Sequence, residues 1–254
     1  MGDNRGVSDL VGFVLTVGII LTGVGIVATV GVDQVERIQG TQDVENAERA
    51  VTVLAGNVEQ LQESRATVLT SELAVHNGRL AIGAGAGPSN LTIDVSGTDV
   101  TLGERPMRTI SYRTGDTRIV YEGGTVIRDN ANGESIAVRE PPFTCSSNRA
   151  VISFVEIHEE DTGQGYSGAT ASITTRTNES RILFPRNRSG EDSLGESTGV
   201  TLTVNSDHEA AWSETLRGAG WELTGTPGEY ECTGESTNTP VFVRKTIVDI
   251  SINR

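Results

Sequence analysis

The stretch from Leu10 to Val32, LVGFVLTVGIILTGVGIVATVGV, constrains this chain more than any other part of its sequence. It contains no charged residue, no Asn, no Gln and no Pro. A helix rises by about 1.5 Å per residue, so a run of this length crosses a hydrocarbon layer of about 30 Å. Asp33 follows directly, and the apolar run ends abruptly on polar sequence. The pattern predicts a membrane-spanning helix near the N-terminus.

Three interpretations fit this apolar run. A secretory signal peptide has an apolar region of about 7 to 15 residues followed by a small-residue cleavage site. Here the run is longer, and its small residues lie inside it rather than at its end. The second interpretation is a plain N-terminal membrane anchor. The third is a helix that is both an anchor and an assembly surface.

Small residues favour the third interpretation. They lie along one helical face at spacings of four, three and four residues: Gly18, Thr22, Gly25 and Thr29. A second face carries Gly12, Thr16 and Gly23. Small side chains let helix backbones approach closely in lipid, and each glycine costs a helix about 1 kcal/mol relative to alanine. Glycine is also common in membrane helices generally, so the composition suggests packing without requiring it.

The segment Arg5-Gly6-Val7-Ser8-Asp9, followed by Leu10–Phe13, resembles the processing site and helix start of archaeal type IV pilins and pilin-like proteins. In that family a short basic leader ends in a small residue, and a prepilin peptidase cuts just before the apolar helix. The resemblance implies that residues 1–6 are the leader and that the cut falls between Gly6 and Val7. Asp9 is the acidic residue near the helix start that recurs in pilins, although many members have Pro at this position.

The same resemblance implies a set of partners. These are a prepilin peptidase, a pilus assembly ATPase with its membrane platform, and other pilin-like subunits, with adhesion as the usual role. Arg5 alone places the N-terminus in the cytoplasm by the positive-inside bias, and the C-terminal domain outside. Ser8 is suited to cap the helix, and Asp9 in the first turn would favour the positive end of the helix dipole.

The chain is predicted to stay helical beyond the membrane. We expect a transmembrane and assembly helix over 7–32 and an extracellular stalk helix over 33–65. Apolar residues recur there at spacings of four, three, four and three: Ala47, Val51, Leu54, Val58 and Leu61. Such a stripe must be buried. Either the domain of the same chain or a neighbouring helix would cover it.

From residue 66 the pattern changes to short alternating segments separated by turns, which predicts a β-rich head over 66–254. Ala66–Val75 and Leu80–Ile82 are expected to form a hairpin through Asn77-Gly78, a strong turn pair. One helix is expected over Asp207–Arg217, capped by Asn205 or Ser206. The fold class is therefore α+β: a long N-terminal helix packed on an antiparallel, sandwich-like and pilin-like head.

Composition bounds the function further. The chain has 34 acidic and 20 basic residues, a net charge of −14, and Lys245 as its only lysine. This composition resembles that of proteins from extreme halophiles, whose acidic surfaces stay hydrated at high salt. It argues against nucleic acid as a partner, because phosphates require a basic surface.

Cys145 and Cys232 are the only cysteines. In a chain that leaves the cytoplasm, such a pair is most simply a disulfide. A metal site is the alternative, but neither cysteine has a second ligand two to four residues away. Three sequons are candidate glycosylation sites, at Asn90, Asn178 and Asn187.

No catalytic motif appears in the sequence, and we expect neither an enzyme, a cofactor nor a resident metal. The acidic run Glu156–Asp161 has the ligand chemistry for a hard cation, but a solvated strand end is the interpretation that composition favours. The leading hypothesis is a pilin-like surface subunit. The alternative is a single-pass, membrane-anchored extracellular binding or sensory module that does not polymerise; an anchored enzyme has no motif to support it.

Overall fold

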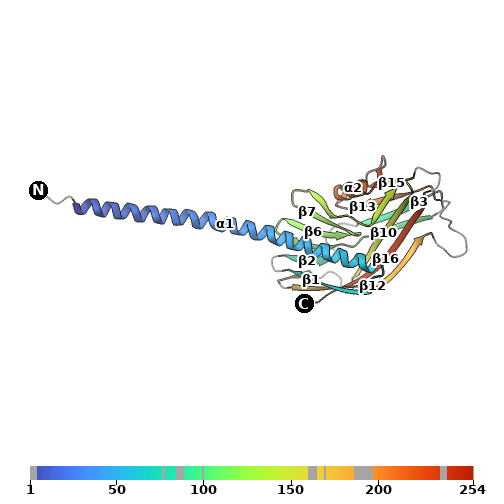
Figure 1. Ribbon diagram of the computed structural model, residues 1–254, viewed down its shortest axis with the longest axis horizontal. Coiled ribbons are helices and arrows are strands. Elements are labelled where there is room, and N and C mark those ends of the chain that lie inside the picture. Colours follow the sequence, from blue (N-terminus) through green and yellow to red (C-terminus); the bar gives the residue numbers. More distant parts are fainter. Residues whose placement is uncertain are drawn as a thin grey trace. The chain divides into compact units, whose positions relative to one another are not determined.

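The protein is described here by a computed structural model (Figure 1). It describes residues 5–75, 78–83, 89–98, 100–159, 165–168, 170–185, 197–234 and 239–253. The chain forms two compact units, Met1–Asp43 and Val44–Arg254. The second unit, called the head below, contains the last part of the long helix and all the described strands.

The N-terminal helix α1 runs from Arg5 to Gln62 and contains 58 residues. The continuation of the helix past the apolar run is therefore confirmed. Its start differs from the expectation: Ser8 lies inside the helix and is not its N-cap, because the helical backbone already begins at Arg5 and continues through Gly6 and Val7.

The end of α1 is a Schellman motif. Ser64 takes the left-handed backbone conformation with φ of 60°. The Arg65 amide donates to the Gln60 carbonyl at 2.9 Å, and the Ser64 amide donates to the Leu61 carbonyl at 3.1 Å. These bonds satisfy carbonyls that the last helical turn would otherwise leave without a donor.

The apolar stripe of α1 is buried in the head of its own chain. All five predicted positions are buried: Ala47, Val51, Leu54, Val58 and Leu61. They share one core with strand residues such as Leu73, Leu80 and Ile119. The alternative, that a neighbouring helix covers this stripe, is wrong for these residues. Burying each large apolar side chain contributes about 1.5–3 kcal/mol.

The described strands form three sheets. Sheet A contains, in order, β1 (Val68–Ala74), β12 (Thr170–Phe184), β16 (Val241–Asn253), β10 (Arg149–Glu159) and β9 (Phe143–Ser146). Sheet B contains β11 (Tyr166–Ser167), β2 (Arg79–Ile82), β5 (Ile110–Thr114), β6 (Thr117–Glu122), β7 (Thr125–Asn130) and β8 (Ser135–Arg139). Sheet C contains β14 (Glu222–Leu223), β15 (Glu229–Thr233), β13 (Gly199–Asn205), β3 (Asn90–Ser96) and β4 (Val100–Pro106).

The sequence pattern predicted an antiparallel head, but the sheets are not purely antiparallel. β10 and β16 pair in parallel, while the other described pairs are antiparallel. Parallel neighbours need a long crossover. The chain between β10 and β16 supplies it, since it includes β13, the helix α2 (Glu209–Gly218) and β15.

The predicted hairpin between Ala66–Val75 and Leu80–Ile82 is wrong. β1 pairs with β12 in sheet A, and β2 pairs with β5 and β11 in sheet B. His76 and Asn77 of the expected turn lie outside the described residues. Gly78 is needed for a close approach, because a Cβ there would collide with the Tyr112 ring. Long-range pairing therefore outweighs the local turn signal.

Sheet A is buried on both faces, so the head is more than a two-sheet sandwich. On one face, Ile152 and Val243 join a core with sheet C and the helix α2. On the other face, Ile157 and Ile250 join the core that contains the stripe of α1 and residues of sheet B. The alternation of side chains along β10 and β16 sends neighbouring residues into these two cores.

The second helix, α2 (Glu209–Gly218), confirms the predicted helix with a different cap. His208 is its N-cap and makes no side-chain capping bond. Ser206, one of the two expected caps, accepts a hydrogen bond from the His208 amide at 3.0 Å instead. Trp212 and Leu216 share the buried face, as expected.

Candidate functional site

The apolar part of α1 is long and apolar enough to cross a membrane. Its window Leu10–Val27 has a mean hydropathy of 2.5 and no residue buried within the chain. It is the only such helix in the part of the chain that the structure describes. By length and composition it fits a membrane anchor or a signal sequence.

Nothing in the described chain explains the glycines in this window. A Cβ added at any of four positions would meet no atom within 4 Å: Gly12, Gly18, Gly23 and Gly25. Glycine in a helix interior costs about 1 kcal/mol relative to alanine. The chain's own packing therefore gives no reason to prefer glycine over alanine at these positions.

The threonines of the window direct their hydroxyl protons inward. Thr22 Oγ1 donates to the Gly18 carbonyl at 2.7 Å, and Thr16 Oγ1 donates to the Gly12 carbonyl at 2.8 Å. This back-bonding satisfies the hydroxyl donors inside the helix. Thr29 lies in α1, but its side chain lies outside the described ones. Close contact between a second helix and the faces that carry Thr16 and Thr22 would thus depend on the shape of these faces rather than on hydrogen bonds donated by the threonines.

The predicted processing site lies at the start of α1. Arg5, Gly6, Val7 and Asp9 all have helical backbone, and their side chains lie outside the described ones. A cut between Gly6 and Val7 would remove two helical residues and make Val7 the first residue of the shortened chain.

Polar contacts join the last turns of α1 to the sheets of the head. Arg128 of β7 pairs with Glu48 at 3.0 Å, and Arg139 of β8 pairs with Glu59. Beyond them, Gln62 Nε2 donates to the Ser153 carbonyl at 3.1 Å. These contacts flank the buried stripe and fix the register of α1 against the head.

Tyr121 is buried and interacts electrostatically with both Arg139 and Glu59. Burial raises the pKa of the Tyr121 hydroxyl well above its usual value. The positive charge of Arg139 opposes this rise, and the negative charge of Glu59 adds to it. The hydroxyl therefore stays neutral throughout the physiological range of pH.

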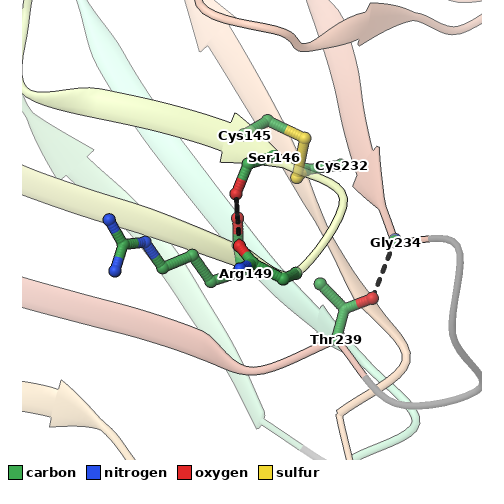
Figure 2. The surroundings of a disulfide bond; sticks show 7 residues. Cys145, Ser146, Arg149, Cys232, Gly234 and Thr239 are labelled. Carbon is green, nitrogen blue, oxygen red and sulfur yellow. Dashed lines mark hydrogen bonds between the residues drawn. A yellow bond between two sulfur atoms is a disulfide. The ribbon is translucent and has the colours of Figure 1, made fainter.

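The predicted disulfide between Cys145 and Cys232 is confirmed (Figure 2). It joins β9 of sheet A to β15 of sheet C, with the two Cα atoms 5.7 Å apart. Ser146 Oγ donates to the Arg149 carbonyl at 3.0 Å in the adjoining turn. The bridge thus ties two sheets across one core, over a sequence separation of 87 residues.

The three sequons differ in their surroundings. Asn178 is exposed on β12, whereas Asn90 is partly buried at the start of β3. Asn187 lies outside the described residues. Of the two described sequons, Asn178 is thus the more accessible.

Two buried polar contacts were not predicted from the sequence. Glu122 Oε2 lies 2.9 Å from His208 Nδ1, and Lys245 Nζ lies 3.2 Å from Glu156 Oε2. Buried charges require partners. A signal for the second pair was present, because a single lysine within a strongly apolar strand must either be exposed or be paired.

The first residue of the acidic run Glu156–Asp161 is therefore neither a free ligand for a hard cation nor part of a solvated strand end. Glu156 is buried and paired, while His158 is exposed. Glu160 and Asp161 lie outside the described residues. Among the side chains that the structure describes, no three potential ligands converge on a metal position.

A cleft of about 670 Å³ opens where α1 and α2 end. Its polar lining includes Glu59, Glu63, Glu140 and Arg244. Glu59 is engaged by Arg139, and Glu63 pairs with Arg65 at 2.9 Å. The cleft presents acidic surface at the end of α1, and we assign no ligand to it.

Comparison with known proteins gives a family and no activity. A search of curated proteins and a search of solved structures each gave no match. A family model matches residues 5–251, which includes the apolar window and nearly the whole head. The chain belongs to DUF7289, a family of unknown function.

Proposed function

We propose that this chain is a pilin-like structural subunit of the cell surface. In this proposal a prepilin peptidase cuts between Gly6 and Val7, and the apolar part of α1 anchors the chain in the membrane. The same part then packs against α1 of other subunits. The head lies outside the cell, where adhesion is its role, and the assembly ATPase with its membrane platform is the machinery that the subunit requires.

The observation that carries this proposal is the open space beside the glycines of the apolar window, where an added Cβ would meet no atom of the chain within 4 Å. Four glycines in the apolar window have open space where a Cβ would stand. In lipid, a helix pair gains from small residues because its backbones can approach closely. A second helix packed at this surface would explain why glycine rather than alanine occupies these positions, which the packing of the single chain does not explain.

The difference in burial between the two ends of α1 supports the same proposal. Buried apolar positions of α1 begin at Ala47, among the described side chains, and continue to Leu61. The residues of the window Leu10–Val27 are exposed. Among the described side chains of α1, those of the last turns pack in the head, whereas those of the apolar window are exposed, which supports a role for the window in contact with lipid and other helices.

Two features support a head that lies outside the cell. Disulfides persist in oxidising environments and are rare in the cytosol, and the bridge between Cys145 and Cys232 is formed. The net charge of −14 suits a surface that faces concentrated salt. Both features agree with an exported head of a halophilic archaeon.

Intact mass spectrometry of the protein from native membranes tests the processing step. We expect a mature chain that begins at Val7. The substitution Gly6→Val should retain the leader, while Gly2→Val, a matched change inside the leader, should leave the mature mass unchanged. A native chain that still begins before Gly6 would favour the non-polymerising anchored module instead.

A further inference from the structure

Asn178 occupies an irregular position in β12. The register runs from Thr177 opposite Val248 to Glu179 opposite Ile247, so a bulge leaves Asn178 without a partner residue on β16. A bulge re-aims the extra residue and locally interrupts the ladder. The side chain of Asn178 is exposed in the described head.

The amide of Asn178 is held by a neighbouring carboxylate. Its Nδ2 atom lies 3.1 Å from Oδ1 and 2.9 Å from Oδ2 of Asp249 on β16. An asparagine amide nitrogen carries two N–H groups. One N–H suffices for the contact with both oxygens of Asp249. The hydrogen of the second N–H can therefore be replaced by another group without loss of the hydrogen bond to Asp249.

The residues that complete the sequon are also placed in the strand. Ser180 Oγ lies 3.2 Å from Thr246 Oγ1 on β16. The sequence Asn178-Glu179-Ser180 is an acceptor pattern for N-glycosylation, which is confined to surface positions of exported proteins. Exposure, the bulge and the remaining N–H together make Asn178 able to carry a bulky group in the folded head.

Asn90 has different surroundings. It is partly buried and stands in register between Asn205 of β13 and Pro106 of β4. Asn90 therefore has a partner residue on each of the two neighbouring strands. Asn178, in contrast, is exposed, and the bulge leaves it without a partner residue on β16.

We propose that Asn178 carries an N-linked glycan in the mature protein and that Asn90 stays unmodified. The donor is a lipid-linked sugar phosphate, and the transfer needs a membrane glycosyltransferase. The bond between the sugar C1 and the phosphate oxygen breaks, a bond between C1 and Nδ2 forms, and the amide proton leaves with the phosphate. The inference rests on the exported head of the proposed function.

Peptide mass spectrometry of the protein from native membranes tests it. Arg176 and Arg181 flank the sequon, so trypsin releases residues 177–181 with Asn178 as their only asparagine. We expect sugar mass on this peptide and none on the peptide that contains Asn90. An unmodified 177–181 peptide, or equal modification of Asn90, would overturn the inference.

Two variants separate the modification from folding. Ser180→Ala should abolish the added mass although Asn178 and its contact with Asp249 remain, and Ser180→Thr, which keeps the sequon, should retain it. Loss of the added mass in both variants would contradict the assignment. Asn178→Gln should also lose it, with the disulfide still formed as evidence of a folded head.

Treatment of whole cells with an external protease distinguishes failure of the glycan assignment from failure of the proposed function. If the head is cleaved from outside and Asn178 is unmodified, only the glycan assignment fails. If the head is protected in intact cells and cleaved after lysis, the exported head itself is refuted, and the glycan assignment fails with it.

Discussion

His208 Nδ1 and Glu122 Oε2 lie 2.9 Å apart in the interior of the head, where the side chain of Glu122 has no exposed surface. His208 stands at the start of α2, and Glu122 ends β6. The other ring nitrogen of His208 faces Asp129 Oδ2 at 3.8 Å, and Asp129 in turn pairs with Arg118 at 2.6 Å. This small polar network fastens α2 to sheet B.

Removing one member of this pair should destabilise the head strongly. His208→Ala would leave the Glu122 carboxylate buried without its partner, which costs about 3–5 kcal/mol of unfolding free energy. The double variant Glu122→Leu/His208→Leu removes both polar groups and should lose much less. Urea unfolding of the solubilised protein measures both, and a double variant as unstable as His208→Ala would contradict this account.

The stripe of α1 should carry much of the attachment between helix and sheets. Leu54→Ala removes a buried side chain and should cost about 2–5 kcal/mol of unfolding free energy. Its neighbour Val53 is 57% exposed, so Val53→Ala should change the unfolding free energy by no more than about 0.5 kcal/mol. Equal effects of the two substitutions would show that the stripe is not buried as described.

The disulfide should stabilise the head mainly by restricting the unfolded chain. Its sequence separation of 87 residues corresponds to roughly 4–5 kcal/mol in the chain-entropy description. The double variant Cys145→Ser/Cys232→Ser should unfold at lower urea than the wild type. A reducing agent should lower the wild-type midpoint and leave that of the variant unchanged; a wild-type midpoint insensitive to reduction would contradict the prediction.

Alkaline pH should destabilise the head through Tyr121. Burial raises the pKa of this hydroxyl in the folded state, so the unfolded chain loses the proton first, near the usual value of about 10. Stability is full below that pH and falls above it, by up to about 1.4 kcal/mol per pH unit. Tyr121→Phe should show a shallower decline between pH 9 and 11.5 in urea unfolding, and equal slopes would refute the assignment.

The sequence predicted the helical part of the fold well because local periodicity decides it. The run after Leu10 and the stripe from Ala47 to Leu61 each lie within one helix, and no distant residue is needed to recognise them. The pairing of the two cysteines also followed from composition and compartment. These features can be recognised from the sequence alone, without knowing which residues lie near one another in the folded chain.

Strand pairing was harder to predict because distant segments decide it. Asn77-Gly78 indicated a hairpin, yet β1 pairs with β12 roughly a hundred residues later. The partners of Glu122 and Lys245 were missed for the same reason. Alternation along β6 places Glu122 on the same face as the buried Val120, but only the fold brings His208 to that position.

Cysteine cross-linking within native membranes tests the assembly of α1 most directly. Both native cysteines are engaged in the disulfide, so Gly18→Cys would supply the only free thiol. At 100° per residue, Val24 lies on neither small-residue face, and Val24→Cys is the matched control. The account predicts cross-linked dimers for Gly18→Cys well in excess of those for Val24→Cys, and equal or absent cross-linking at Gly18 would contradict it.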